Sequence, residues 1–268
     1  MKIRGSLVAG ICGLLIMLAM ITIPAEANPL IYNGSSGSLG ASATFNISGG
    51  NLLVTLTNTS SSDVLSQAGV LTGLFFEVAG DPLFSKTSAV IAPGSTVMFP
   101  PAGNPSGTGP TPVGSVGEEW GYRNGLAGYL SPTSTVNEAI LSAAYGGVFS
   151  TWPGGGTSSL FTPGNLQGEA GPGKLQYGIT SLLDNPLTGS TDVKGANALI
   201  QNSAIFTLGS LSGGFNLSSI SNVYFQYGIN ITDPRFAGVE APAVPEPSTF
   251  LLLLAGFAVA GVRKLIVK

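Results

Sequence analysis

The chain has 268 residues, of which only 9% are charged, and a formal net charge of −3. The five Lys and Arg residues between Asn28 and Ala243 are scattered, whereas neutralising nucleic-acid phosphates requires clustered basic residues, so we expect no nucleic-acid binding. There is no histidine, and Cys12 is the only cysteine. Because Cys12 lies in the apolar N-terminal segment, the mature chain should lack disulfides, Cys-ligated metal sites and a thiol nucleophile.

The N-terminal residues predict a secretion signal. Two basic residues precede an apolar run from Leu7 to Ile23, and Ala25 and Ala27 then supply small side chains at both positions that a signal peptidase inspects. We expect cleavage after Ala27, which makes residues 1–27 a signal peptide. The alternative is an uncleaved membrane anchor, which the shortness of the apolar run disfavours.

The first part of the mature chain has the two-residue alternation of half-buried strands. Residues 43–48 alternate apolar and polar side chains, Gly49 and Gly50 provide a turn, and residues 52–56 resume the alternation. This pattern predicts a β-hairpin. Residues 70–78 are apolar on both faces, which predicts a central strand.

The composition shifts toward Gly, Pro, Ser and Thr between about residues 100 and 173. We expect a loop-rich insert there. One short helix is predicted inside it, because residues 135–138 have the spacing of a capping box and residues 139–145 favour helix. The alternative is a flexible insert with no fixed structure.

The last third of the mature chain resumes the strand pattern, at residues 175–180, 203–209 and 223–231. Apolar strand faces must be buried, and antiparallel sheets bury them by packing against each other. We therefore predict that residues 28–243 form an all-β domain, an antiparallel β-sandwich with long Gly/Pro/Ser-rich loops. The pattern does not predict the order of the strands.

The chain ends in an extended motif, an apolar stretch and a basic end. The prolines of the motif cannot lie inside a helix, so they hold it extended, as a protease cleft requires. The apolar stretch could form a transmembrane helix across a bilayer about 30 Å thick, with its basic residues on the cytoplasmic side. The three parts are Pro245, Glu246 and Pro247, then Phe250–Val262, then Arg263 and Lys264.

This tail, residues 244–268, resembles the PEP-CTERM sorting signal of exosortase-dependent proteins in Gram-negative bacteria. The resemblance implies that an exosortase recognises Pro245, Glu246 and Pro247 and that the basic end acts as the stop. The chain would then pass transiently through the inner membrane, lose its apolar tail and reach the cell surface or extracellular matrix. The alternative is a tail that stays as a permanent single-span anchor.

Five segments of the domain are also similar, in the same order, to the XDD group of exosortase-dependent surface proteins. The similarity is patchy between residues 100 and 173. That group has no established activity to carry over, so the resemblance implies location rather than chemistry. The segments are residues 70–78, 175–181, 198–203, 206–208 and 220–228.

Three aromatic residues of the loop-rich insert, Trp120, Tyr122 and Trp152, are candidates for stacking on a sugar ring. The alternative is ordinary anchoring of core or loops. Glu118 and Glu119 lie beside them, but adjacent residues of a strand point to opposite faces. They would therefore not form the carboxylate pair that a glycosidase needs, and a solvent-exposed edge explains them better.

We predict no catalytic residue, cofactor or metal site. Asp184, Asn185 and Asp192 lie close together in a turn-rich stretch, but the alternating carboxylates of a calcium loop are missing. Serines are abundant, yet a serine nucleophile needs a base, and neither S-x-x-K nor G-x-S-x-G occurs. The chain is therefore expected not to be an enzyme.

These observations predict an exported, exosortase-processed surface or extracellular-matrix protein, structural or adhesive, associated with exopolysaccharide. Its expected partners are signal peptidase and exosortase during export, the membrane through its C-terminal helix before processing, and exopolysaccharide afterwards. The alternative is a secreted carbohydrate-binding module or a carbohydrate-active enzyme.

Overall fold

The computed structural model describes residues 28–98, 114–142, 160–161, 175, 177–194, 198–230 and 232–242. Nearly all regular structure in these residues is β-strand. The strands are β1 (Leu30–Ser36), β2 (Leu39–Ser48), β3 (Asn51–Asn58), β4 (Leu71–Val78), β5 (Ser85–Ile91), β6 (Thr96–Met98), β7 (Trp120–Arg123), β8 (Glu138–Ser142), β9 (Ile179–Thr180), β10 (Leu199–Gln201), β11 (Ser203–Gly209), β12 (Ile220–Tyr227), β13 (Arg235–Ala237) and β14 (Val239–Glu240). Short 3-10 helices are η1 (Gln67–Gly69), η2 (Gly117–Glu119) and η5 (Leu217–Ser219).

The first sheet has the strand order β14-β1-β2-β3-β11-β5, and all its neighbours are antiparallel. The predicted hairpin is confirmed as β2 and β3, which pair continuously up to Ser48 opposite Asn51. Gly49 and Gly50 link the two strands with φ values of 56° and 76°. Tight hairpin turns require such positive φ values, which glycine adopts without strain. The strand predicted at residues 203–209 is confirmed as β11.

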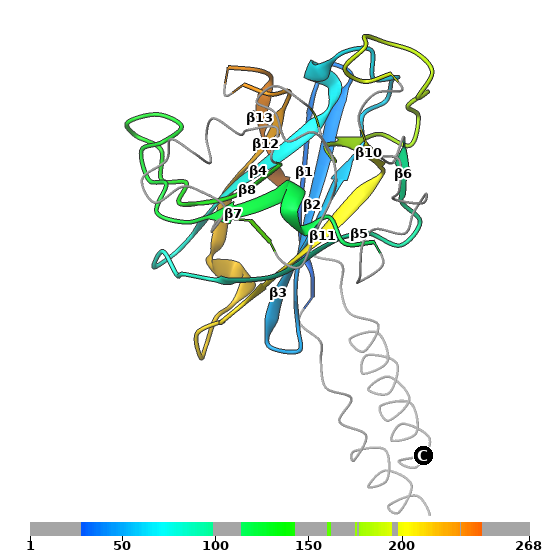
Figure 1. Cartoon of the computed structure of the whole chain (residues 1–268). Coiled ribbons are helices and arrows are strands. Elements are labelled where there is room, and N and C mark those ends of the chain that lie inside the picture. Colours follow the sequence, from blue (N-terminus) through cyan, green and yellow to red (C-terminus); the bar gives the residue numbers. More distant parts are fainter. Residues whose placement is uncertain are drawn as a thin grey trace, which may run out of the picture.

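The second sheet has the order β13-β12-β4-β9-β10-β6, with β8 paired to β4 and β7. Its pairs are antiparallel except β9 with β10, which are parallel. The predicted central strand is confirmed as β4, which lies between β12 on one side and β8 and β9 on the other. Figure 1 shows the late strands β12 and β13, in orange, beside the early strand β4, in cyan.

The two sheets share one apolar core, the arrangement expected of a β-sandwich. Phe45 and Val54 from the first sheet belong to the same buried cluster as Leu74 and Phe76 from the second. The rings of Phe45 and Phe76 lie 5.4 Å apart. Burying each such side chain contributes about 1.5–3 kcal/mol, so this shared core is the main source of stability. The prediction of an all-β, antiparallel domain is confirmed.

The helix predicted at residues 135–145 is wrong. Residues 138–142 form strand β8, which pairs on both sides, and all five are buried. The capping-box spacing is a local signal of modest strength. In the sheet, by contrast, the backbone of β8 forms hydrogen bonds with a strand on each side, and both faces of β8 are buried. Strands β7 and β8 also bring part of the expected loop-rich insert, residues 114–142, into the second sheet.

Two predicted strands are shorter than expected. Of the described residues at 175 and 177–180 only the last two form β9, because Tyr177 has a φ of 54° and leaves the extended conformation. The alternation predicts a strand that continues to residue 231, but β12 ends at Tyr227. Gly228 follows with a φ of 74° and turns the chain.

The two predicted processing segments, residues 1–27 and 244–268, lie outside the described residues. The signal helix and the C-terminal transmembrane helix therefore stay predictions. Within the described part of the chain, none of the helices has the length and apolar character needed to span a bilayer.

Candidate functional site

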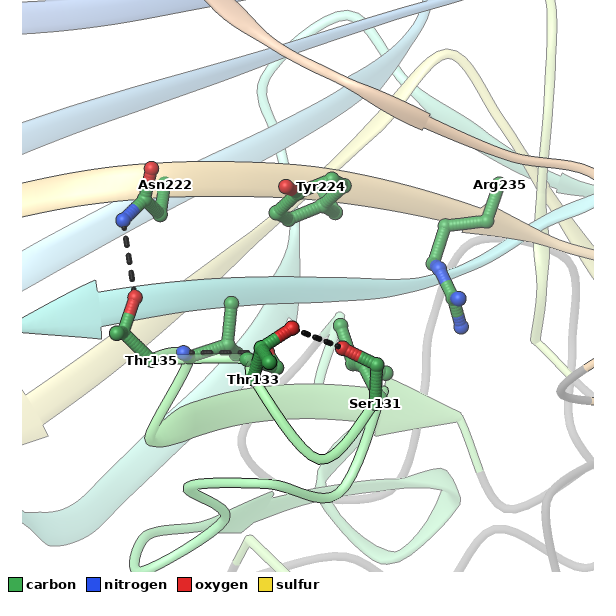
Figure 2. A pocket seen from close by; sticks show the side chains of 9 residues that line it. Ser131, Thr133, Thr135, Asn222, Tyr224 and Arg235 are labelled. Atoms are coloured by element: carbon green, nitrogen blue, oxygen red, sulfur yellow. Dashed lines mark hydrogen bonds between the residues drawn. The ribbon is translucent and has the colours of Figure 1, made fainter.

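A polar groove of about 350 Å³ lies between strands β12 and β13 and the loop that leads into β8. Figure 2 shows this groove from close by. Most of its side chains carry hydroxyl or amide groups, with one aromatic ring and one guanidinium among them. The lining residues are Leu130, Ser131, Thr133, Ser134, Thr135, Val136, Asn222, Tyr224 and Arg235.

The loop wall of the groove is anchored to the sheet at both ends. The side-chain amide of Asn137 accepts a hydrogen bond from the N–H of Val78 and donates one to its C=O, both at 2.8 Å. This amide therefore pairs with β4 as a neighbouring strand would. Leu126 and Val136 pack beside Phe75 in a small apolar cluster on the outer face of the second sheet. The loop is thus held in place before any ligand arrives.

The strand wall depends on an irregularity in β12. The pairing of β12 with β4 shifts register between Ser221 and Tyr224. Asn222, inside this bulge, has a φ of 46°, a left-handed conformation that asparagine tolerates better than most residues. Bulges re-aim side chains and often lie beside functional sites. This one leaves Asn222 exposed at the groove.

Three side chains join the two walls at one end of the groove. The Oε2 atom of Glu77 accepts hydrogen bonds from the Thr135 hydroxyl and the Asn222 amide, both at 2.6 Å. The Asn222 amide also donates to the Thr135 hydroxyl at 3.1 Å. These bonds, that from Thr135 foremost, lower the pKa of Glu77. Glu77 is therefore ionised at neutral pH and already engaged within the protein.

The rest of the groove carries an aromatic ring, hydroxyls and a positive charge. Tyr224 is partly buried and packs against the outer apolar cluster. Figure 2 shows Tyr224 between Asn222 and Arg235 along one wall, with Ser131 and Thr133 on the opposite loop. The hydroxyls of Ser131 and Thr133 lie 3.4 Å apart. One face of the groove is thus partly apolar and the other offers hydrogen-bonding groups.

This combination suits a polyhydroxylated ligand. Hydroxyl and amide groups both donate and accept hydrogen bonds, so they match the same groups on a sugar. A ring held by packing offers a rigid apolar surface, at little entropic cost, to the C–H face of a sugar ring. A concave site with a few convergent polar groups is also the usual form of a small-molecule site.

The structure places the predicted stacking residues elsewhere. Trp120 is 0% exposed and Tyr122 is 2% exposed, so neither ring offers a face to a ligand. The Trp120 ring lies 4.9 Å from that of Phe206, and its Nε1 donates to the Tyr177 carbonyl at 2.9 Å. Trp120 and Tyr122 therefore anchor the core, which is the alternative interpretation of these two residues. Trp152 lies outside the described residues.

Two carboxylates near these rings are buried in the fold rather than exposed. Glu119 is 4% exposed, so the expected solvent-exposed edge is wrong for this residue. Glu138 is fully buried, and the Tyr122 hydroxyl donates to its Oε2 at 2.5 Å. Its Oε1 has no hydrogen-bond partner among the described residues. Burial raises the pKa of Glu138 to about 8, so this side chain is mostly protonated at neutral pH.

Asp184 and Asn185, two of the residues considered for calcium, instead join two loops. Asp184 accepts a hydrogen bond from the Val64 N–H at 3.1 Å, and the Asn185 N–H donates to Asp63 at 2.8 Å. Burial raises the pKa of Asp184 to about 6. Hydrogen bonds from Thr188 first, and from the Asn185 backbone, lower the pKa of Asp63. Across the described residues, no group of three or more His, Cys, Asp or Glu side chains could hold a metal ion.

The sequence pattern predicts only part of the groove. The alternation in β12 placed Asn222 and Tyr224 on the strand face opposite the core. No pattern in the sequence indicates that the 131–135 loop lies against that face or that Arg235 belongs to the groove. The sorting residues Pro245, Glu246, Pro247, Arg263 and Lys264, and the cleavage residues Ala25 and Ala27, lie outside the described residues.

Comparison with known proteins supports the interpretation of the C-terminal tail. The model of the PEP-CTERM protein-sorting motif matches residues 243–264. This motif marks the chain for export and exosortase handling, with the cell surface or extracellular space as its destination. No curated protein and no solved structure gives a match. The similarity to the XDD group stays a prediction.

Proposed function

We propose that this chain, which carries a PEP-CTERM sorting motif, is a non-enzymatic structural or adhesive component of a Gram-negative cell surface or extracellular matrix. In this proposal the exosortase delivers the domain, and the domain then holds exopolysaccharide. The observation that carries the second step is the polar groove beside β12, which combines hydroxyl groups with a packed aromatic ring.

The hydrogen bonds that hold the walls of the groove favour binding over catalytic turnover. Its loop is joined to the sheet through Asn137, and its carboxylate, Glu77, is engaged by Thr135 and Asn222. A carboxylate that accepts two strong hydrogen bonds and has a lowered pKa is a poor general base. The same bonds preorganise the walls, which improves affinity because less ordering is needed when a ligand binds.

The export step predicts the mass and location of the protein recovered from native cells. We expect mass spectrometry of the intact protein to show loss of residues up to Ala27 and of the segment beyond the Pro245, Glu246 and Pro247 motif. The processed form should lie outside the inner membrane. Replacing all three motif residues by alanine should leave the tail uncut. A wild-type chain intact through Lys268 in the inner-membrane fraction would contradict the proposed processing.

The binding step predicts that the exported protein co-sediments with exopolysaccharide prepared from the same cells. Tyr224→Ala removes the aromatic surface of the groove and should weaken binding about tenfold, which corresponds to about 1.4 kcal/mol. The matched control is Tyr129→Ala, since the Tyr129 ring also packs on the outer side of the second sheet, against Phe75, but does not line the groove. This control should bind like the wild type.

Two outcomes would contradict the proposed binding role. Wild-type protein that does not co-sediment with the exopolysaccharide would remove its main basis. Release of shorter saccharides during the incubation would show turnover, and would favour the carbohydrate-active enzyme instead. A melting curve for each variant separates lost contacts from lost folding.

A further inference from the structure

Among the described residues that line the groove, Arg235 alone carries a positive charge. It lies on β13 opposite Gln226 of β12 and is partly buried. Its Nη1 atom is buried and has no hydrogen-bond partner among the described residues. Figure 2 shows the guanidinium extending from its strand toward the loop side of the groove, beyond Tyr224.

A buried guanidinium nitrogen without a partner is costly, because its N–H groups have lost water and gained nothing in return. A planar carboxylate is well matched to such a group, since it accepts two parallel hydrogen bonds from one guanidinium. Glu77, the carboxylate that joins the groove walls, is committed to Thr135 and Asn222 at the other end. Because Arg235 also lines the groove, a ligand there can supply the missing partner when the guanidinium turns toward it.

We propose that the groove binds a carboxylate-bearing saccharide and that Arg235 receives the carboxylate. This inference rests on the proposed function and adds the chemical class of the ligand. The sugar ring lies on Tyr224, its hydroxyl groups meet Ser131 and Thr133, and its acid group reaches the Arg235 end.

The charges of the groove also set the direction of the ligand. Asn222, which contacts Glu77, and Gln226, which lies opposite Arg235, are four positions apart on β12. Strand residues are spaced by about 3.3 Å, so the β12 positions that mark the negative and positive ends are about 13 Å apart along the strand. An acidic sugar is repelled at the Glu77 end and attracted at the Arg235 end. A neutral sugar has no such preference.

The test compares two forms of one polymer with the full exported protein purified from cells. The probes are polygalacturonate oligosaccharides and the same oligosaccharides with their carboxyl groups methyl-esterified. The wild type should bind the free acid at least about tenfold more tightly, and added salt should reduce this preference. Arg235→Gln should bind both forms equally, with unchanged affinity for the ester. Arg235→Lys should keep only part of the preference, because lysine cannot form the paired hydrogen bonds.

The control variant is Arg123→Gln, which removes the same charge from β7, away from the lining of the groove. It should keep the full preference for the free acid. Melting curves for all variants confirm that each remains folded. If Arg235→Gln does not fold, the ratio of the wild-type affinities for the free acid and the ester, and the salt dependence of that ratio, still show whether the groove prefers a carboxylate.

Several results would overturn the inference. Equal wild-type binding of acid and ester would leave a neutral saccharide site and the proposed function intact. A preference that survives in Arg235→Gln would place the acid elsewhere. Equal, Arg235-dependent binding of dextran sulfate would mean that any anion is accepted. Failure to bind both these probes and the exopolysaccharide of the native cells would remove the inference together with the proposed binding role.

Discussion

Between pH 4.5 and 7, Glu138 is expected to lower the free energy of unfolding by about 3 kcal/mol, and Glu138→Gln should abolish this dependence. Burial raises the pKa of Glu138 from its ordinary value of 4.5 to about 8. Below pH 4.5 both the folded and unfolded chains are protonated here, so there is no effect. Between pH 4.5 and 8 the folded chain keeps a proton that the unfolded chain loses, and stability falls by about 1.4 kcal/mol per pH unit.

Urea denaturation of wild type and Glu138→Gln across this pH range measures the effect directly. The difference between the two profiles should slope from pH 4.5 to 8 and be flat outside that window. Glu77→Gln is the matched control, because hydrogen bonds lower the pKa of Glu77. That carboxylate stabilises the fold above its ordinary pKa and loses this contribution as the pH falls, so its difference profile has the opposite sign. Parallel profiles for wild type and Glu138→Gln would refute the assignment.

Trp120→Ala should destabilise the domain by about 3–5 kcal/mol, the usual cost of truncating a large buried aromatic residue. Trp120 is fully buried, and its ring packs against that of Phe206. The ring of Phe161 packs against Phe206 as well. The substitution leaves a cavity and removes the partner of the Tyr177 carbonyl, which Nε1 of Trp120 satisfies. Urea denaturation provides the measurement.

The same substitution separates the two interpretations of Trp120. If its ring were a stacking platform for sugar, Trp120→Ala would weaken binding while stability stayed near that of the wild type. The structure predicts the reverse, namely lost stability and unchanged affinity for exopolysaccharide in whatever fraction remains folded. Trp120→Phe serves as the control and should recover part of the stability, because it refills much of the cavity.

The contrast between β2–β3 and β8 explains how far the fold could be predicted. In the hairpin, the alternation, the Gly49 and Gly50 turn and the pairing of neighbouring segments all act locally, and the prediction holds. At residues 138–142 the local signal favours helix, yet the strand forms because β4 and β7 pair with it from both sides. The partners of β8 are distant in sequence, so no local pattern contains them.

The groove, too, is predicted by local pattern in one part and depends on long-range contacts in the other. Alternation along β12 predicts that Asn222 and Tyr224 face away from the core, because side chains of a strand alternate between its faces. The bulge at Asn222 and the packing of the 131–135 loop against β12 depend on long-range contacts. The position of Arg235 opposite Gln226 depends on the pairing of β12 with β13. Those contacts turn scattered polar residues into one site.

The sequence by itself determined the destination of this protein, because a protease reads a sorting motif such as residues 243–264 as a short linear segment. It also determined the all-β class and the local hairpin, which follow from the alternation of neighbouring residues. Only the tertiary structure decided that Trp120 and Tyr122 belong to the core, that Glu138 is a buried acid, and that a groove forms beside Tyr224. The burial and charge environment of these residues depends on contacts between segments that are far apart in the sequence. The local periodicity of side chains does not encode such contacts.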